Sequence, residues 1–310
     1  MEYLSAENVR ELFTMEETIQ AIESFYLDAT EGNELTPDRM HIEDGDNTSL
    51  LMPSYYGDYY ATKLVGVAPH NTNIGKPTIH GLMVLYDRQT MEPLTMCDAV
   101  PITALRTGAL GGLGMKYLAK ENASSLGIIG TGTQGWSHLQ SALAVRSIDT
   151  VNVYNRSQDK LAKFIEAARK EFPEIVIQQA SLEDVVHQSD IIVTTTTSKT
   201  PVLPKLKAAD WKGKLIVGVG SFRPSMQEIP DSILEQADET YVDTPSAFRE
   251  SGDMIRAKEL GVDPRQTLSL KEMIERQHRP ASPENQVIIF KSVGAAIFDL
   301  VTAKALYEKL

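Results

Sequence analysis

A glycine-rich loop, Gly130-Thr131-Gly132-Thr133-Gln134-Gly135, has the spacing of a phosphate-binding turn. An apolar run at 126–129 leads into it, and a segment with helical character follows to about residue 145. In such a unit the first glycine permits a tight turn, the second lets backbone approach a pyrophosphate, and the third allows close helix–strand packing. The helix N-terminus adds free N–H groups and a positive dipole end. We therefore predict a dinucleotide site that includes Gly130, Gly132, Thr133, Gln134 and Gly135.

The next apolar run, 151–154, ends in Asn155-Arg156-Ser157. NAD-selective folds place an acidic residue at this point, against the ribose 2′-hydroxyl. Here no carboxylate repels a 2′-phosphate, and a guanidinium, an amide and a hydroxyl are able to bind one. The triplet favours NADP(H), with NAD(H) still possible. A solvated Arg156 and a helix-capping Ser157 would explain the same residues.

Basic residues lie in unexpected places in the first third of the chain, at Arg39, Lys63 and Arg106. Lys63 belongs to an otherwise apolar or small run at 61–68, so it must extend to solvent, lie at an edge or serve a buried anion. Arg106 has only small or apolar helix neighbours. Each cation alone has a structural explanation. Together they would bind a carboxylate.

Other chemistries lack their residues. The GxSxG motif of serine hydrolases is absent, and the histidines are scattered, with no metal-binding spacing: His41, His70, His80, His138, His187 and His278. Hydride transfer remains, in which a cofactor reacts and the protein orients the substrate. The net charge of −12 argues against nucleic acid or anionic membranes as main partners.

The single cysteine, Cys97, excludes an internal disulfide, and its apolar setting indicates a buried structural thiol. The N-terminus lacks the regions of a signal peptide. No run approaches the roughly 18 apolar residues of a membrane span. These features favour a cytoplasmic protein.

The N-terminal third has the pattern of an α+β unit. A capping box at residues 14–17 begins a helix that runs to Gly32, and a polar, turn-rich stretch follows. Strands are expected at 61–68, 79–86 and 94–97. A helix at 99–118 is rich in small residues, which indicates close packing at Gly108, Ala109, Gly111, Gly112 and Gly114.

From residue 125 onward strands and helices alternate. Strands are expected at 126–129, 151–154, 175–177, 191–194, 215–219, 240–242 and 286–290, with helices that include 157–170, 181–187 and 293–310. Such alternation predicts an α/β protein with a Rossmann-type doubly wound parallel sheet. We expect a Rossmann domain at 120–290. A smaller α+β substrate and dimerisation domain would comprise 1–119 together with 291–310.

The chain resembles the ornithine cyclodeaminase/mu-crystallin family over nearly its whole length. The resemblance rests on the succession of Arg39, Lys63, Gly75-Lys76-Pro77-Thr78, Ala104-Leu105-Arg106-Thr107-Gly108, the loop 130–135, Val217-Gly218-Val219-Gly220-Ser221, Glu250-Ser251-Gly252-Asp253 and Lys291-Ser292-Val293-Gly294. It implies a homodimer in which Arg39, Lys63 and Arg106 grip a substrate carboxylate, Lys63 and Arg106 act in catalysis, and Val293 and Gly294 face the substrate. The cofactor would be lined by Thr78, Thr107, Gln134, Asn155, Arg156, Ser157, Thr196, Val219 and Ser292.

One departure from the family pattern bears on the reaction. Cyclodeaminases place a catalytic aspartate two residues before the proline in the loop after Val219, where this chain has Phe222. Oxidation of a protonated amine needs a proton acceptor, and phenylalanine is not one. An acid from Glu43-Asp44-Gly45-Asp46 is an open alternative, although that stretch has the composition of a solvated loop.

A cyclic imine can arrive already protonated, so its reduction needs mainly positioning and hydride. We therefore expect an NAD(P)H-dependent reductase of cyclic imino acids, acting on Δ1-pyrroline-2-carboxylate or Δ1-piperideine-2-carboxylate to give L-proline or L-pipecolate. The alternatives are an ornithine cyclodeaminase that recycles NAD+, an alanine-type amino-acid dehydrogenase, and a cofactor-binding, crystallin-like protein without activity.

Overall fold

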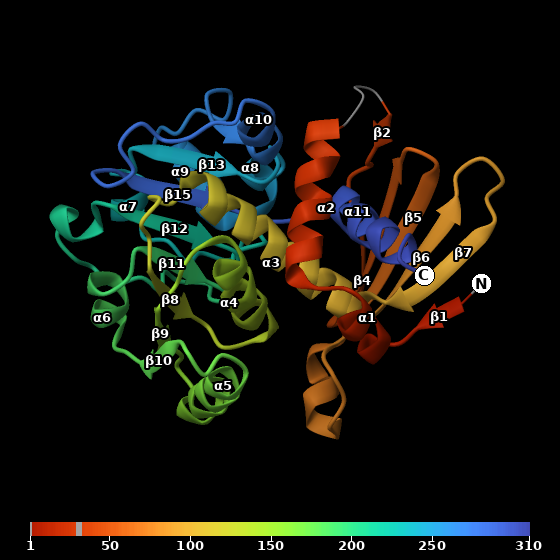
Figure 1. Ribbon diagram of the computed structural model, residues 1–310, viewed down its shortest axis with the longest axis horizontal. Helices are drawn as coiled ribbons and strands as arrows, with labels where there is room; N and C mark the ends of the chain where they lie inside the picture. The colour runs from red at the N-terminus through yellow and green to blue at the C-terminus, as the bar shows by residue number, and fades with distance from the viewer. Residues whose placement is uncertain (1, 29–32) are drawn as a thin grey trace. The chain divides into compact units, whose positions relative to one another are not determined.

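The computed structural model describes residues 2–28 and 33–310 and divides into two compact units. The first unit comprises the chain up to Arg106 together with Gly294–Leu310, and the second comprises Thr107–Val293. The predicted α/β class, with a doubly wound parallel sheet and a smaller α+β part, is confirmed (Figure 1). The predicted substrate and dimerisation roles of the domains stay predictions.

The first unit is built on a largely antiparallel sheet. In the part of the chain that the structure describes, this sheet has 7 strands in the order β1-β7-β6-β5-β4-β2, with β3 also paired to β4. Only the β1–β7 pair is parallel among these described strands. The strands are β1 (Glu2–Leu4), β2 (Glu34–Leu35), β3 (Met40–Asp44), β4 (Asn47–Tyr56), β5 (Tyr59–Val67), β6 (Ile79–Asp87) and β7 (Pro93–Asp98).

The prediction of a turn-rich stretch before residue 61 was wrong, because β3 and β4 lie there. All of β3 is exposed, so it carries no alternation of apolar and polar residues that would reveal a strand. In β4 the residue that argues against a strand is Pro53, since proline cannot donate a backbone hydrogen bond. β3 pairs with residues 47–51 of β4 and β2 with residues 55–56, so Pro53 lies between the two partners and displaces no hydrogen bond to either.

Helices cover one face of this sheet. α11 (Ala296–Tyr307) packs on β4, β5, β6 and α2 (Met15–Asp28), and α1 (Ala6–Leu12) packs on β7. A short 3-10 helix, η1 (Pro69–Ile74), precedes β6. The predicted capping box is present, since Thr14 N donates to Glu17 Oε2 and Glu17 N donates to Thr14 Oγ1. The predicted end of this helix at Gly32 lies outside the described residues.

The second unit contains a parallel sheet. Its 8 strands, counted within the described residues, have the order β10-β9-β8-β11-β12-β15-β13-β14. They are β8 (Ser125–Ile129), β9 (Thr150–Tyr154), β10 (Val176–Gln179), β11 (Ile191–Thr194), β12 (Lys214–Gly218), β13 (Glu239–Val242), β14 (Leu268–Ser269) and β15 (Val287–Lys291). The connecting helices are α4 (Thr133–Val145), α5 (Gln158–Glu171), α6 (Leu182–His187), η2 (Ala208–Trp211), α7 (Asp231–Leu234), α8 (Ala247–Glu250), α9 (Gly252–Glu259) and α10 (Leu270–Glu275).

The order of these strands creates a switch point. The chain proceeds from β8 outward through β9 to β10, then returns to the other side of β8 with β11 and continues outward through β12. In doubly wound sheets, ligands bind outside the carboxyl ends of the strands at such a reversal. The topology therefore places the expected cofactor site across the ends of β8 and β11.

Helix α3 (Ala99–Leu118) begins and ends as predicted, and its glycines explain its composition. A Cβ on Gly111 would lie 2.4 Å from the His138 ring, and one on Gly114 would lie 2.5 Å from the Phe290 ring. These contacts within the second unit leave room only for glycine and confirm the predicted close packing. No helix in the described ranges is long and apolar enough to cross a membrane.

Candidate dinucleotide and carboxylate sites

The loop between β8 and α4 has the geometry that a pyrophosphate requires. Gly130 has φ +110°, in the left-handed region, and a Cβ there would lie 2.8 Å from Thr195 Oγ1. A Cβ on Gly135 would lie 2.1 Å from Gly130 O, so the helix approaches the strand as closely as predicted. At Gly132, by contrast, no described atom lies within 4 Å of the Cβ position. That space is open to a ligand.

The start of α4 leaves polar groups of this loop without a partner in the described chain. Gly132 is the N-cap residue of α4 and has no side chain with which to bond the N–H groups of the first turn. The buried Oγ1 of Thr131 has no hydrogen-bond partner among the described residues. Buried hydroxyls are normally paired, so an orphaned one beside a free helix N-terminus fits an anionic ligand. The loop residues therefore suit the phosphates of a dinucleotide.

The triplet predicted to select the cofactor follows β9. Asn155 Nδ2 donates to Ser157 O at 3.0 Å, and Ser157 is the N-cap residue of α5. Arg156 is exposed between them. Ser157 thus occupies the capping position but makes no side-chain hydrogen bond to the helix, and this position does not exclude the binding of a phosphate. The guanidinium of Arg156 is accessible for that purpose.

The first unit brings the predicted cations together around one buried acid, Asp299. Lys63 Nζ, from β5, lies 2.9 Å from Asp299 Oδ1 and 2.8 Å from Oδ2. Arg106 Nε, from α3, donates to Oδ1 at 3.0 Å. Arg39 joins through the backbone, since its Nη2 donates to Gly294 O at 2.6 Å.

Gly294 is the residue that lets two of these cations approach. It has φ +73°, and a Cβ there would lie 1.8 Å from Arg106 Nη1. Any side chain would therefore displace the guanidinium of Arg106 as well as strain the backbone. Gly294 thus lies against both Arg39 and Arg106, and its place beside the substrate stays a prediction.

Burial determines the electrostatics of this cluster. Lys63, Arg106 and Asp299 are 2%, 6% and 0% exposed. Burial lowers the pKa of Lys63 to about 8, against the stabilising charge of Asp299 and together with repulsion from Arg106 and Arg39. Burial opposes ionisation of Asp299, but Lys63 and Arg106 outweigh it and keep the pKa of that carboxyl low. One carboxylate thus pairs with two cations, which leaves positive charge for a second anion.

Asp299 was missing from the sequence-based site. A signal was available, because it is the only acidic residue in the otherwise apolar or small stretch 295–303. An acid in such a helix must be paired if it is buried. Asp299 is thus as anomalous in its segment as Lys63 is in its own, and the two side chains are partners.

The remaining predicted cofactor residues are distributed over both units. Val219 and Ser292 directly follow β12 and β15, and Thr196 lies two residues past the end of β11. These three strands are neighbours in the second sheet. Thr107 is buried on α3, and Thr78 belongs to the first unit, just before β6. Their contacts with a cofactor stay predictions.

Val293, predicted to face the substrate, is positioned by an acid of the second unit. Its N–H donates to Asp243 Oδ2 at 2.8 Å, and Ser292 Oγ donates to the same oxygen at 2.9 Å. The carboxylate thus fixes the turn that leaves β15.

Phe222 and the acidic stretch at residues 43–46 bear on the catalytic acid that the family pattern would place in the loop after Val219. Phe222 is 40% exposed, with Arg223 stacked over its ring at 5.7 Å. The stretch Glu43–Asp46 is not a loop but the end of β3 and the turn into β4, and its exposure to solvent is confirmed.

Cys97 is buried as predicted, and burial raises the pKa of its thiol to about 12.

Comparisons with known proteins show the family of the chain and solved structures that resemble it. The ornithine cyclodeaminase/mu-crystallin family matches residues 2–310. A Delta(1)-pyrroline-2-carboxylate reductase of Bacillus cereus is 36% identical over 99% of this chain and 95% of its own. Among solved structures, the Thermococcus litoralis Delta(1)-pyrroline-2-carboxylate reductase, in complex with NADH and L-proline, has a TM-score of 0.91 at 32% identity, covering 100% of this chain and 97% of that one. An archaeal alanine dehydrogenase dimer with bound NAD has a TM-score of 0.89 at 30% identity, covering 99% and 95%.

Proposed function

We propose that the chain, which belongs to the ornithine cyclodeaminase/mu-crystallin family, is an NAD(P)H-dependent reductase of cyclic imino acids, converting Δ1-pyrroline-2-carboxylate or Δ1-piperideine-2-carboxylate to L-proline or L-pipecolate. The observation that carries the proposal is the buried cation cluster on Asp299, whose surplus positive charge suits the carboxylate of an imino acid. The first unit would hold the substrate and form the dimer, and the second would hold the dinucleotide.

The substrate carboxylate would be bound by Arg39, Lys63 and Arg106. Asp299 holds Lys63 and Arg106 in place before the substrate arrives, so little side-chain order has to be gained on binding. When bound, the nicotinamide cofactor supplies a hydride to the carbon of the C=N bond. The nitrogen needs one proton. With a pKa of about 8, Lys63 is able to hold or release that proton near neutral pH.

NADP(H) is the favoured form of the cofactor. Arg156 is exposed after β9, and Asn155 and Ser157 flank it without a carboxylate that would repel a 2′-phosphate. NADH and NAD are bound in the two solved relatives, and NAD(H) remains the alternative for this chain.

Phe222 favours reduction over cyclodeamination. Its side chain cannot accept the proton that oxidation of a protonated amine releases. The alternative acids at residues 43–46 lie in an exposed hairpin. Reduction of an imine that arrives protonated makes no such demand, and Lys63 is available for proton exchange.

The decisive assay is oxidation of NADPH and NADH in the presence of each cyclic imine. We expect turnover with at least one imine, faster with NADPH, and no ammonia release from L-ornithine. Absence of turnover with both cofactors would refute the proposal. Ammonia release without net NADH formation would identify a cyclodeaminase instead.

Alanine-type dehydrogenase activity is the second candidate, because the archaeal alanine dehydrogenase is nearly as similar in structure. A carboxylate clamp would serve pyruvate as well as an imino acid. Reductive amination of pyruvate with ammonium, measured in the same assay, separates the two. We expect it to be much slower than imine reduction.

The first unit also supports a homodimer. The sheet face opposite α11 exposes apolar side chains that line one shallow pocket, and Ile42, Leu64, Ile79 and Leu82 are 50%, 41%, 49% and 37% exposed. Exposed apolar patches of this kind mark protein–protein contacts. Light scattering after size-exclusion chromatography should give twice the mass of the 34.3 kDa chain.

A further inference from the structure

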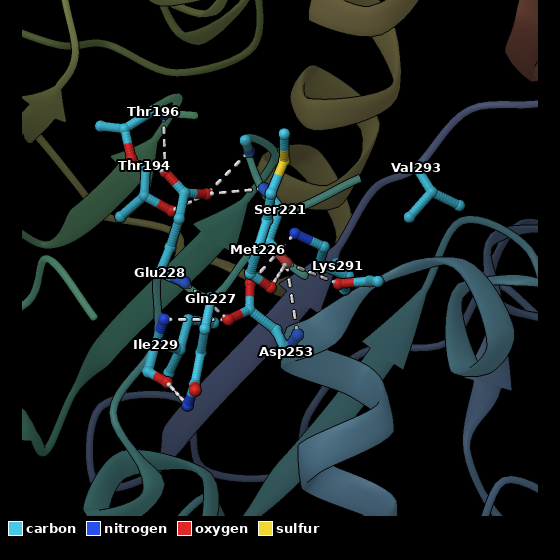
Figure 2. Close-up of polar contacts among 12 residues, drawn as sticks. Thr194, Thr196, Ser221, Met226, Gln227, Glu228, Ile229, Asp253, Lys291 and Val293 are labelled. Atoms are coloured by element: carbon cyan, nitrogen blue, oxygen red, sulfur yellow. Dashed lines mark hydrogen bonds and ion pairs between the residues drawn. The ribbon is translucent and has the colours of Figure 1, made fainter. Parts of the chain in front are cut away.

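The mechanism proposed above makes no use of a fully buried acid in the second unit, Glu228. Its Oε2 accepts hydrogen bonds from Thr194 Oγ1 at 2.9 Å, Gly220 N at 2.7 Å and Ser221 N at 3.2 Å. Its Oε1 accepts from Thr196 N at 2.6 Å and from Thr196 Oγ1 at 2.7 Å (Figure 2). Both oxygens face backbone N–H donors, an arrangement that suits the ionised carboxylate.

The donors to Glu228 come from two separate segments of the chain. Thr194 and Thr196 lie at the end of β11, and Gly220 and Ser221 follow β12. The two segments touch, because a Cβ on Gly220 would lie 1.9 Å from Thr196 O. The carboxylate of Glu228 therefore joins the carboxyl ends of two adjacent parallel strands at a point that admits no side chain.

Glu228 is itself fixed by a second buried acid. Asp253 Oδ1 accepts from Glu228 N at 2.8 Å and from Ile229 N at 3.0 Å, and Lys291 Nζ lies 3.2 Å from Asp253 Oδ2 (Figure 2). Asp253 and Lys291 are both fully buried. Buried ionic groups are a poor means of gaining stability. We therefore look for the role of this network in the two backbone segments that it holds and in the ligand that those segments would position.

The sheet topology indicates what that is. A dinucleotide at the switch point lies across the carboxyl ends of the strands on both sides of it. The glycine loop and Arg156 follow β8 and β9, so the adenine half belongs to that side. The other half then falls to β11 and β12. Those are the strand ends that Glu228 joins.

We propose that Glu228 is a positioning residue for the nicotinamide half of the cofactor. It holds the segments Thr194–Thr196 and Val219–Ser221 in the arrangement that receives this half and makes no contribution to the adenine half. This inference rests on the dinucleotide-binding part of the proposed function and is independent of the substrate.

The test compares whole dinucleotides with their adenine halves. For Glu228→Gln, an amide N–H₂ replaces one accepting oxygen and opposes the backbone donors. We expect calorimetry to show about tenfold weaker binding of NADPH or NADH, equivalent to about 1.4 kcal/mol. Binding of 2′,5′-ADP or ADP should stay within about twofold, because the loop and Arg156 are unchanged.

Asp190 provides a matched control at the opposite edge of the sheet. It accepts hydrogen bonds from Ser124 N, Ser125 N and Ser125 Oγ at the amino end of β8 and pairs with Lys120. Asp190→Asn should lower the melting temperature without changing the ratio of dinucleotide to adenine-half affinity. A parallel loss of both ligands in Glu228→Gln, or unchanged NADPH and NADH binding in that variant, would overturn the proposal.

Thr194→Val keeps the test decisive if Glu228→Gln does not fold. It removes one buried hydroxyl donor to Glu228 and nearly preserves shape. We expect a smaller loss, about threefold, for the dinucleotide alone, and equal changes in both ligands would overturn the proposal. Because every readout is binding, a wild-type protein that binds NADPH but reduces no imine would refute the proposed substrate and not this role of Glu228.

Discussion

Each unit buries a cluster of charged side chains, and the two clusters differ in the sign of the charge left over. In the first unit Lys63 and Arg106 share the single carboxylate of Asp299, with Arg39 nearby. In the second unit Lys291 pairs with Asp253, and Glu228 adds a second acid. One cluster is cationic and the other anionic.

The clusters also differ in which groups stabilise their excess charge. Burial raises the pKa of Glu228, and backbone and hydroxyl donors on both of its oxygens oppose this effect and stabilise its negative charge. In the cationic cluster Lys63 and Arg106 carry two positive charges against one carboxylate, and the further acceptor of Lys63, Thr103 Oγ1 at 3.4 Å, is neutral. A cluster satisfied from within fixes the backbone around it, whereas one left with a net charge is prepared to bind a counter-ion.

The two buried lysines provide the sharpest contrast. Lys63→Met removes a cation that would bind substrate and exchange a proton, so we expect kcat/KM for the imine to fall by at least about 100-fold. Lys291→Met leaves Asp253 buried without its cation, and we expect the free energy of unfolding to fall by roughly 3 kcal/mol. Steady-state kinetics and urea unfolding should be measured on both variants.

A carboxylate analogue that carries no reactive bond, pyrrole-2-carboxylate, isolates the binding step in these variants. Lys63→Met should weaken it, and Lys291→Met should leave it within about twofold of wild type. Equal weakening in both variants would contradict the division of roles between the clusters.

Asp299→Asn tests the internal balance of the cationic cluster. The amide keeps the shape but leaves Lys63 and Arg106 buried without a counter-charge, so we expect roughly 3 kcal/mol or more of lost stability. Asp263→Asn, in a pair with the exposed Arg265, should have little effect, since an amide oxygen is still able to accept from Arg265 N. A stable Asp299→Asn protein with unchanged imine kinetics would show that Asp299 does not organise the cations.

Arg156→Ala sharpens the comparison at the cofactor side. Removing a charged donor to the 2′-phosphate should weaken NADPH by between about 10-fold and 100-fold and leave NADH unchanged. Arg265→Ala, another exposed arginine, is the control. Equal effects on NADPH and NADH would make Arg156 a residue without a role in selecting the cofactor.

The sequence predicts the second unit well because its signals are local. Strands such as Ile191–Thr194 are short, buried apolar runs, and the glycine loop carries its own geometry. In the first unit β3 and β4 lack that signal, since β3 is wholly exposed and Pro53 interrupts β4. A helix or strand can be recognised from the local sequence only where its burial requires apolar residues at a regular spacing or in a continuous run.

The charged residues of the two clusters also differ in whether the local sequence reveals them. Lys63 and Arg106 are visible because a cation in an apolar segment is anomalous by itself. Glu228 lies outside any helix or strand. Its structural role depends on hydrogen-bond donors that are up to 34 residues away in the sequence, at Thr194. No spacing in the sequence encodes that convergence, because only the parallel sheet brings the two strand ends together.

The smallest expected effect is the pH dependence of the cationic cluster. Burial and the neighbouring Arg106 and Arg39 lower the pKa of Lys63 to about 8, against the opposing charge of Asp299. Lys63 is therefore charged below about pH 8 and neutral above it, so affinity for pyrrole-2-carboxylate should fall as the pH rises. Because both arginines stay charged, the loss between about pH 7 and 9 should remain below about tenfold. Lys63→Met should bind the analogue equally at both pH values, and a wild-type affinity that is flat or rises with pH would place the titrating group elsewhere.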